Sequence, residues 1–191
     1  MPHGPFSVCV YCGSRDGADP AFASDAEAVG RLLAGRGWRL VYGAGDVGLM
    51  GRVARAAQAA GGATLGVIPE HLMAREVGKR DLDTLVVTET MHERKKVMFM
   101  NADAIVVLPG GAGTLDEMFE ALTWRQLGLH DKQVFLLNTS GYWTPFTELL
   151  KSVVAGGFAG PDLVRMVTVA SSVAALGDAV DFVAASRGHG G

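Results

Sequence analysis

The apolar positions of the chain gather into short unbroken runs, and longer alanine-rich or amphipathic segments lie between these runs. The apolar runs predict strands at Ser7–Cys12, Arg39–Tyr42, Thr64–Ile68, Thr84–Thr88, Ala104–Leu108, Val134–Leu137 and Met166–Val169. The segments between them predict helices at Ala21–Arg36, Gly48–Ala60, His92–Asn101, Thr114–Leu129, Trp143–Ala155 and Ser172–Ala185. Strands that are apolar throughout expect cover on both faces of their sheet. The pattern therefore predicts an α/β fold, a Rossmann-like doubly wound parallel sheet in three α/β/α layers.

The predicted sheet indicates where a ligand would bind before any motif is considered. In doubly wound sheets, ligands bind beyond the carboxyl ends of the strands, where the strand order reverses. The loops that follow the first five strands are 13–19, 43–48, 69–83, 89–94 and 109–113. We expect the functional residues in these five loops.

Composition limits the class of protein and its partners. With 191 residues, 49% of them hydrophobic and 19% charged, the chain is expected to form one soluble domain spanning 1–191. The net charge of −3, and a longest basic run of only Arg94–Lys96, disfavour nucleic acid as a partner. The apolar runs are strand-sized, so no membrane span is expected, and the first residues lack the basic flank of a signal peptide.

The two cysteines, Cys9 and Cys12, form a C-x-x-C that is typical of redox or metal sites. Both fall on a predicted strand, where positions three apart face opposite sides of the sheet. A structural zinc site would also require two further ligands. We therefore expect two independent buried thiols, no metal, and a reducing compartment such as the cytoplasm.

The segment Pro109–Glu117, which reads Pro-Gly-Gly-Ala-Gly-Thr-Leu-Asp-Glu, directly follows a predicted strand. Glycines between a buried strand and a helix leave backbone N–H groups directed outward, and these groups bind phosphate together with the positive helix end. Glu117 is expected in the first turn of that helix, where a phosphate site needs no acid. Two interpretations of Glu117 stay open: an acid for chemistry on a phosphorylated substrate, or a capping box formed by Thr114 and Glu117.

Two further loops offer candidate contacts to a ligand. Residues 43–48 contain Gly43, Gly45 and Gly48 in a G-x-G-x-x-G spacing, but without the later acid of a dinucleotide site. These glycines serve a tight turn and close packing, or they let a base or ribose lie against bare backbone. The loop after the first strand adds the Ser14 hydroxyl and the Arg15 guanidinium, for which a solvated turn is the alternative.

Arg94 and Lys95 are expected in the first turns of the helix His92–Asn101. Positive charge at a helix N-terminus opposes the macrodipole, by some tenths of a kcal/mol. Two interpretations of this unfavourable placement stay open. The positive charge serves a function at the carboxyl end of a strand, or Arg94 and Lys95 form a solvated basic face. The proximity of Arg94 to the Pro109–Glu117 loop in the predicted sheet favours a functional role for both Arg94 and Glu117.

These motifs resemble those of the LONELY GUY family, the cytokinin riboside 5′-monophosphate phosphoribohydrolases. The segments that carry the resemblance are Cys9–Ser14, Tyr42–Gly51, Arg75–Glu76, Met91–Lys95, Pro109–Glu117 and Thr123–His130. The resemblance implies a Rossmann-like homodimer that hydrolyses the N-glycosidic bond of purine riboside 5′-monophosphates, AMP included. Two departures, Ala44 and Arg15, lie near the expected ligand. Relatives are often labelled lysine decarboxylases, but no lysine here has the context of a pyridoxal phosphate site.

The resemblance also assigns roles to individual positions. Arg94 and Glu117 correspond to the catalytic pair. The substrate-binding positions that it implies are Glu76, Lys95, Gly111, Ala112, Gly113, Thr114, Leu115, Asp116 and Thr123. The loop residues considered above add Ser14, Gly43 and Gly45. No metal and no cofactor are expected. The rival functions are a non-catalytic nucleotide or molybdenum-cofactor carrier of the same fold, and a dinucleotide-dependent oxidoreductase.

The sequence also predicts a homodimer. The helix expected at Thr114–Leu129 carries apolar residues around much of its surface, and so does His92–Asn101. Pairing of two copies would bury this excess next to Arg94 and Glu117. The alternative is a monomer in which the C-terminal helix covers the same apolar surface.

Overall fold

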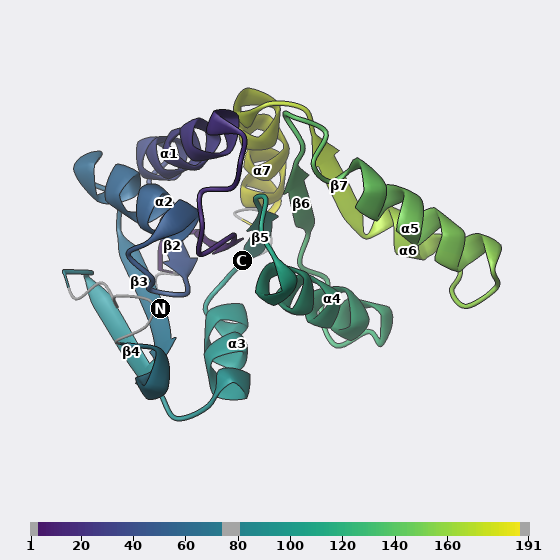
Figure 1. The fold of residues 1–191 in the computed structure, drawn as a ribbon, viewed down its shortest axis with the longest axis horizontal. Coiled ribbons are helices and arrows are strands. Elements are labelled where there is room, and N and C mark those ends of the chain that lie inside the picture. Colours follow the sequence, from purple (N-terminus) through teal and green to yellow (C-terminus); the bar gives the residue numbers. More distant parts are fainter. Residues whose placement is uncertain (1–3, 74–80, 188–191) are drawn as a thin grey trace.

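The computed structural model describes residues 4–73 and 81–187, and within them parallel strands form one sheet in the order β4-β3-β2-β1-β5-β6-β7 (Figure 1). The strands are β1 (Ser7–Tyr11), β2 (Arg39–Tyr42), β3 (Thr64–Pro69), β4 (Thr84–Thr88), β5 (Ala104–Val107), β6 (Val134–Leu137) and β7 (Val167–Ala170). The chain runs outward from β1 to β4 and then returns to the other side of β1 as β5. The order therefore reverses between β1 and β5, and this switch point positions the ligand cleft.

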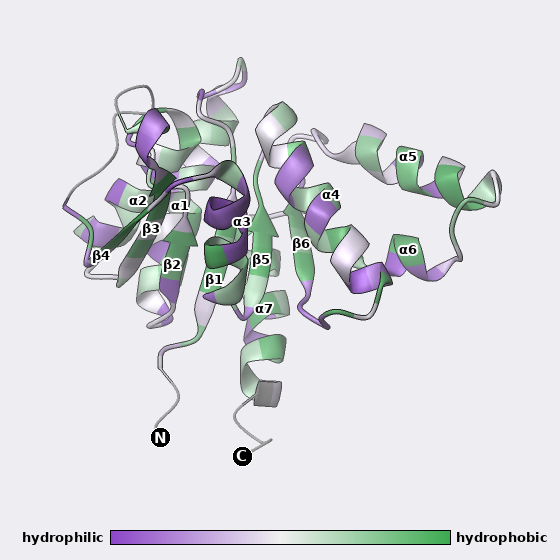
Figure 2. Ribbon diagram, turned by 90° about the horizontal axis from the view of Figure 1, so that it is seen from below, coloured by the Kyte–Doolittle hydropathy of each residue, from purple (hydrophilic) through white to green (hydrophobic). Residues whose placement is uncertain are grey.

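Helices cover both faces of the sheet, which confirms the three-layer Rossmann-like fold. They are α1 (Pro20–Gly35), α2 (Gly48–Ala59), α3 (Met91–Met100), α4 (Ala112–Gln126), α5 (Thr144–Ala155), α6 (Asp162–Arg165) and α7 (Val173–Arg187), with a short 3₁₀ turn η1 (Glu70–Leu72). Two apolar cores result: α1, α2 and α7 pack on one face, and α3 to α6 pack on the other. Figure 2 shows apolar strands between the two layers of helices.

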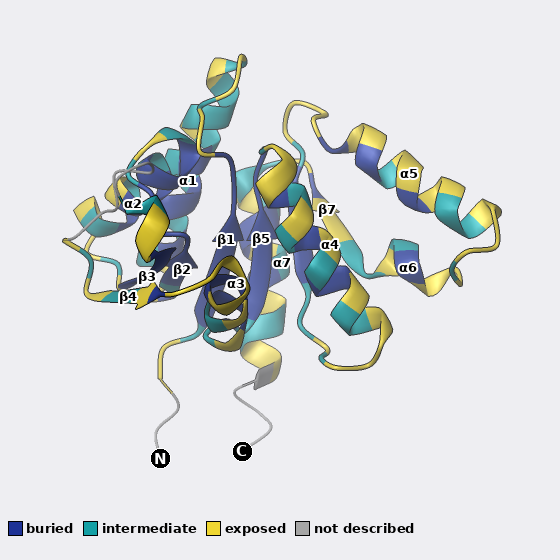
Figure 3. Ribbon diagram, turned by 60° about the horizontal axis from the view of Figure 1, so that its bottom comes forward, coloured by how far each residue is buried: buried dark blue, intermediate teal, exposed yellow. Residues whose placement is uncertain are grey.

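The inner strands are buried along almost their whole length, with only Arg39 of β2 half-buried, whereas the edge strands are more exposed. Every residue of β1, β5 and β6 is buried, but β4 and β7 contain exposed positions because each has only one neighbouring strand (Figure 3). The expectation of two-sided cover is therefore wrong for the two edges. Cys9 and Cys12 are free and buried, and they belong to opposite cores, as the strand period predicts.

The predicted elements differ from the observed ones mainly at the ends of helices, and the largest difference is at the end of α4, which stops at Gln126 rather than at Leu129. α4 begins at Ala112, two residues before the predicted start, because Gly111 has the extended backbone of a helix N-cap (φ −93°, ψ −154°). α3 begins at Met91, directly after the cap residue Thr90. The sequence pattern also missed η1 and α6, which are too short to show a helical period. Among the described residues, no helix is long and apolar enough to cross a membrane.

Candidate active site

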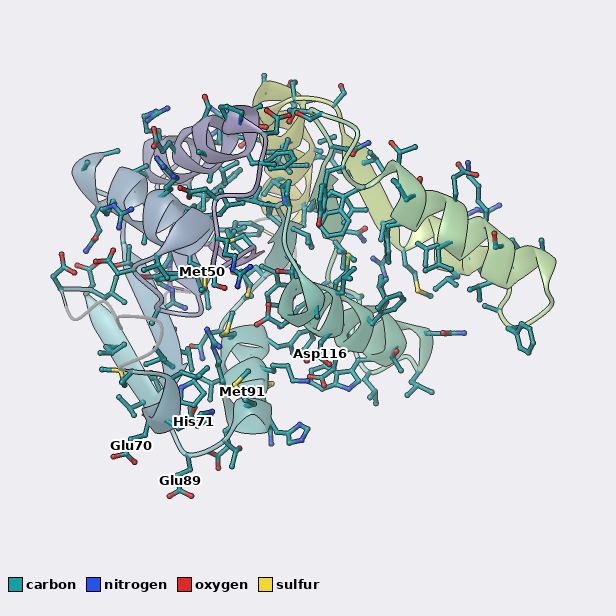
Figure 4. All side chains as sticks on the ribbon, in the orientation of Figure 1. Met50, Glu70, His71, Glu89, Met91 and Asp116 are labelled. Carbon is teal, nitrogen blue, oxygen red and sulfur yellow. The ribbon has the colours of Figure 1, made fainter. Side chains whose placement is uncertain are left out.

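A cleft of about 540 Å³ lies at the carboxyl ends of β1 and β5, at the switch point of the sheet. Figure 4 labels three of its lining residues, Met50, Met91 and Asp116, which come from α2, α3 and α4. The described residues that line the cleft are Val10, Cys12, Gly13, Ser14, Arg15, Asp16, Gly17, Phe22, Gly43, Leu49, Met50, Met91, Arg94, Met98, Pro109, Gly110, Gly111, Ala112, Gly113, Thr114, Asp116, Glu117 and Tyr142.

The N-terminus of α4 presents free backbone donors to this cleft. The first helical hydrogen bond joins the Leu115 N–H to the Gly111 carbonyl at 3.1 Å, and no side chain caps the helix. Within the described part of the chain, the N–H groups of residues 111–114 donate to no protein acceptor. The first N–H groups of a helix carry its positive dipole end, so this arrangement suits an anion.

Two glycines of this cradle are not required by the packing of the protein itself. A Cβ atom added to Gly111 or Gly113 would meet no heavy atom within 4 Å, and neither glycine has a positive φ. By contrast, a Cβ on the preceding Gly110 would lie 2.1 Å from the Thr114 hydroxyl oxygen. The bare backbone of Gly111 and Gly113 therefore borders open space in the cleft.

Glu117 lines the cleft from the second turn of α4. Because α4 begins at Ala112, the predicted place of Glu117 in the first turn is wrong, and so is its capping box with Thr114. The capping box of this region belongs to α3, where Thr90 and Glu93 exchange two bonds of 3.2 Å each. The capping-box alternative for Glu117 is thereby removed, and Glu117 lines the cleft about one and a half turns beyond the start of α4.

Arg94 is buried, with 4% of its surface exposed, and its guanidinium ties together the ends of two strands. Its Nε donates to the Val67 carbonyl at 3.2 Å and its Nη2 to the Gly43 carbonyl at 2.7 Å. A solvated basic face is therefore the wrong interpretation of Arg94. The side chain lines the cleft and also supports the structure around it.

The charges of Glu117 and Arg94 both act on the Cys12 thiol, which lines the cleft. Burial raises the pKa of this thiol, the Glu117 carboxylate raises it further, and the Arg94 guanidinium opposes the rise. Cys12 is therefore protonated at neutral pH and is no nucleophile. Arg94 and Glu117, from two different helices, converge on the same end of β1.

Comparisons with known proteins show the family of this chain. A family model described as "Possible lysine decarboxylase" matches residues 50–180. The "Cytokinin riboside 5'-monophosphate phosphoribohydrolase LOG" of Oryza sativa subsp. japonica is 43% identical over 169 residues, which cover 88% of this chain and 70% of that protein. The cytokinin riboside 5′-monophosphate phosphoribohydrolase of Mycobacterium tuberculosis is 43% identical over 170 residues, covering 89% and 90%. This chain belongs to the LONELY GUY family of phosphoribohydrolases.

Membership confirms the family that the motifs predict and makes the chain a hydrolase of N-glycosyl bonds.

Solved structures share the fold of this LONELY GUY protein. The molybdenum cofactor carrier protein of Chlamydomonas reinhardtii has a TM-score of 0.71 at 25% identity, covering 95% of this chain and 99% of that chain. The molybdenum cofactor binding protein of Rippkaea orientalis has a TM-score of 0.70 at 24% identity, covering 96% and 99%.

The LONELY GUY cleft contains most, but not all, of the residues that the sequence assigned to it. Besides Arg94 and Glu117, the predicted catalytic pair, it brings together Ser14, Gly43, Gly111, Ala112, Gly113, Thr114 and Asp116. Among the described residues, the lining does not include Gly45, Lys95, Leu115 or Thr123. Glu76 lies outside the described residues. The proposed substrate contacts of these five positions stay predictions.

Lys95 is not among the described residues that line the cleft, although its partner Asp116 is. Its ammonium donates to Asp116 at 3.0 Å and to Glu120 at 2.7 Å, which joins α3 to α4. Burial lowers the pKa of Lys95, but these two hydrogen bonds outweigh that effect and raise it overall. A solvated basic face is the wrong interpretation of Lys95 as well, because only 6% of it is exposed. Lys95 holds the two helices that carry Arg94 and Glu117 against each other.

Packing explains the glycines of the loop that follows β2. Gly48 has a φ of +57°, and a Cβ there would lie 2.3 Å from the backbone of Ser14 and Arg15. A Cβ on Gly43 would lie 2.0 Å from Nη2 of Arg94. Gly43 therefore makes room for the Arg94 guanidinium. The family departure at Ala44 has a φ of +56°, a region that favours glycine.

Sequence reasoning missed several residues of this site. Tyr142 and Phe22 form part of the rim, and Met50, Met91 and Met98 add an apolar wall. Tyr142 follows β6, so the rule that ligands bind at carboxyl ends of strands applies to it as well. It was missed because only the loops of the first five strands were considered. The methionines could not be identified as cleft residues from the sequence, since apolar residues in helices predict a core.

Replacing Gly43 with Ala is expected to lower kcat/KM by about 10²-fold, the typical effect of moving a catalytic group by about 1 Å. The backbone of Gly43 accepts alanine, but the new methyl group would displace the Arg94 guanidinium. Steady-state kinetics with AMP measure the effect. Gly35→Ala is the matched control, because a Cβ there meets no atom within 4 Å. Normal activity of Gly43→Ala would show that the position of Arg94 is unimportant.

Proposed function

We propose that this chain hydrolyses the N-glycosidic bond of purine riboside 5′-monophosphates, cytokinin riboside 5′-monophosphates and AMP among them, to give the free base and ribose 5-phosphate. The observation that carries the proposal is the spacing along α4 between its N-terminal backbone donors and Glu117. Its N-terminus offers the empty donors of residues 111–114, and Glu117 follows about 7–8 Å further along the helix axis. A ribose 5-phosphate group held at the cradle extends from its phosphorus to C1′ over a comparable length.

Glu117 supplies the charge that the reaction requires. As the bond between C1′ and the base nitrogen breaks, positive charge develops on the ribose ring. A carboxylate next to C1′ stabilises that charge and orients the water whose oxygen forms the new bond to C1′. Phosphate binding at the cradle fixes the ribose over the acid, so that binding energy from a remote group contributes orientation at the reacting carbon.

Arg94 fixes the opposite side of the cleft. Its bonds to the Val67 and Gly43 carbonyls hold the guanidinium rigidly at the cleft wall. A planar guanidinium in that place binds phosphate or ribose oxygens with little loss of side-chain entropy. We assign to Arg94 the orientation of the substrate toward Glu117.

A substrate panel tests the proposed function. The purified protein is incubated with AMP, isopentenyladenosine monophosphate and other nucleoside monophosphates, and released base is measured to give kcat/KM. We expect turnover of at least one purine riboside monophosphate. Tight binding of a nucleotide or of molybdenum cofactor without any release of base would favour the carrier alternative, whose fold the Chlamydomonas reinhardtii protein shares.

We further propose that the active form is a homodimer joined by the outer surfaces of α3 and α4. Phe119 (41%), Leu127 (68%) and Met100 (67%) are exposed there, whereas Met118 and Met98 belong to the core, which leaves a smaller patch than the sequence predicts. The C-terminal helix α7 packs on the opposite face of the sheet, so it does not cover this patch. A second copy would cover it.

Light scattering is expected to give twice the 20.0 kDa mass of the chain at micromolar concentration. Leu127→Glu should shift the protein to the monomer, because a charge would replace an apolar side chain in the centre of the contact, and it should lower activity together with mass. Leu149→Glu is the matched control on α5, where the leucine is 49% exposed. A fully active species of 20 kDa would refute the dimer.

A further inference from the structure

Tyr142 reaches the cleft rim from a rigid turn that follows β6. The Trp143 N–H donates to the Asn138 side-chain oxygen at 2.6 Å, and Gly141 has the positive φ of +73° that this reversal requires. Trp143 itself is buried, with 2% of its surface exposed, and anchors the end of the turn in the core. The phenol ring of Tyr142 is therefore presented by a fixed backbone.

The ring of Tyr142 is held from two sides. It packs edge-on against Phe22 with the ring centres 5.5 Å apart, and against Trp143 at 4.9 Å. Its hydroxyl donates to the Gly110 carbonyl at 2.6 Å. Since 41% of Tyr142 is exposed, water is available to this hydroxyl, and the hydrogen bond is not needed to satisfy a buried polar atom. The bond instead holds the loop that contains Gly110.

Two consecutive carbonyl groups of that loop are held by different parts of the chain. The Pro109 carbonyl accepts from the Gly13 N–H at 3.0 Å, and the Gly110 carbonyl accepts from Tyr142. In a trans peptide the C=O and the following N–H point in opposite directions. Holding the Gly110 carbonyl therefore also sets the direction of the Gly111 N–H, the first donor of the cradle. Without this bond, two adjacent glycines would leave that peptide plane free to rotate.

We propose that Tyr142 is a positioning residue for phosphate binding, which acts through the Gly110 carbonyl on the Gly111 N–H. The inference rests on the proposed function, in which residues 111–114 hold the 5′-phosphate of the substrate. It assigns to the turn after β6 a part in recognising the phosphorylated end of the substrate rather than its base.

The test compares Tyr142→Phe with the wild-type protein in the binding of two separate products. Calorimetry is expected to show about tenfold weaker binding of ribose 5-phosphate, the typical effect of one lost hydrogen bond, and unchanged binding of adenine. With AMP as substrate, KM should rise about tenfold while kcat stays within about twofold. Tyr42→Phe is the matched control, because its buried hydroxyl finds no hydrogen-bond partner in the described structure. It should change neither product affinity.

A second variant tests the same link without removing the hydroxyl. Gly141→Ala strains the turn at its positive φ and so shifts Tyr142, which should weaken ribose 5-phosphate binding and leave adenine binding intact. Wild-type affinity of Tyr142→Phe for ribose 5-phosphate would overturn the inference, and so would equal losses for both products. If the wild-type protein binds no ribose 5-phosphate and does not hydrolyse AMP, the proposed function itself fails, independently of Tyr142.

Discussion

Glu117→Gln is expected to lower kcat for AMP hydrolysis by about 10³-fold or more, which corresponds to ~4 kcal/mol of transition-state stabilisation. Glutamine has nearly the shape of glutamate but lacks the negative charge that faces the developing positive charge at C1′. The cradle of residues 111–114 is separate from Glu117 along α4, so binding of ribose 5-phosphate should persist. The variant should therefore bind its ligand and fail in the chemical step.

Stability distinguishes this outcome from a folding defect. Glu117 makes no capping box, and we expect its replacement to leave the melting temperature within about 2 °C. Glu148→Gln is the matched control, because Glu148 is exposed on α5 and pairs with Lys151 across the helix surface. Near-normal turnover by Glu117→Gln would contradict the mechanism and reduce the residue to a structural role.

The second large effect concerns the substrate. Adenosine, which lacks the 5′-phosphate, is expected to give a kcat/KM about 10³-fold or more below that of AMP, since remote binding energy is used for orientation at the reacting carbon. ATP should also be a poor substrate, because one helix N-terminus fits one phosphoryl group and the loop has no Walker-type lysine. The measurement is release of adenine from each compound under identical conditions. Comparable rates for adenosine and AMP would contradict the assignment of the cradle.

Gly113→Ala links this prediction to the structure. Because a Cβ at Gly113 meets no protein atom, alanine in α4 should raise stability by about 0.5–1 kcal/mol. The same methyl group occupies the space reserved for phosphate, so kcat/KM for AMP should fall while the slow rate with adenosine stays unchanged. Gly35→Ala should stabilise α1 without this loss. A variant that gains stability and keeps full activity with AMP would show that the open space at Gly113 has no ligand.

The first residue of α4 shows which features a local sequence pattern predicts and which it does not. The sequence located the glycine segment, the strand before it and the helix after it, because glycine and apolar runs act over a few neighbouring residues. It misplaced the first residue of α4 by two positions, because Thr114 and Glu117 also match a capping box. Only the backbone of Gly111 decides between the two starts, and that decision changed the interpretation of Glu117 from a cap to an acid facing the cleft.

The sequence by itself determined the parallel α/β layers, the glycine segment at the start of α4 and the loops that carry Arg94 and Glu117, since each follows from the order of apolar runs, glycines and charges along the chain. The tertiary structure alone decided that Arg94 bonds to Gly43, 51 residues away, and that Tyr142 holds Gly110, 32 residues away. It also decided that Lys95 pairs with Asp116 and Glu120 of α4. Contacts of this kind depend on which side chains the packed sheet brings together, and a local pattern of residues does not contain that information.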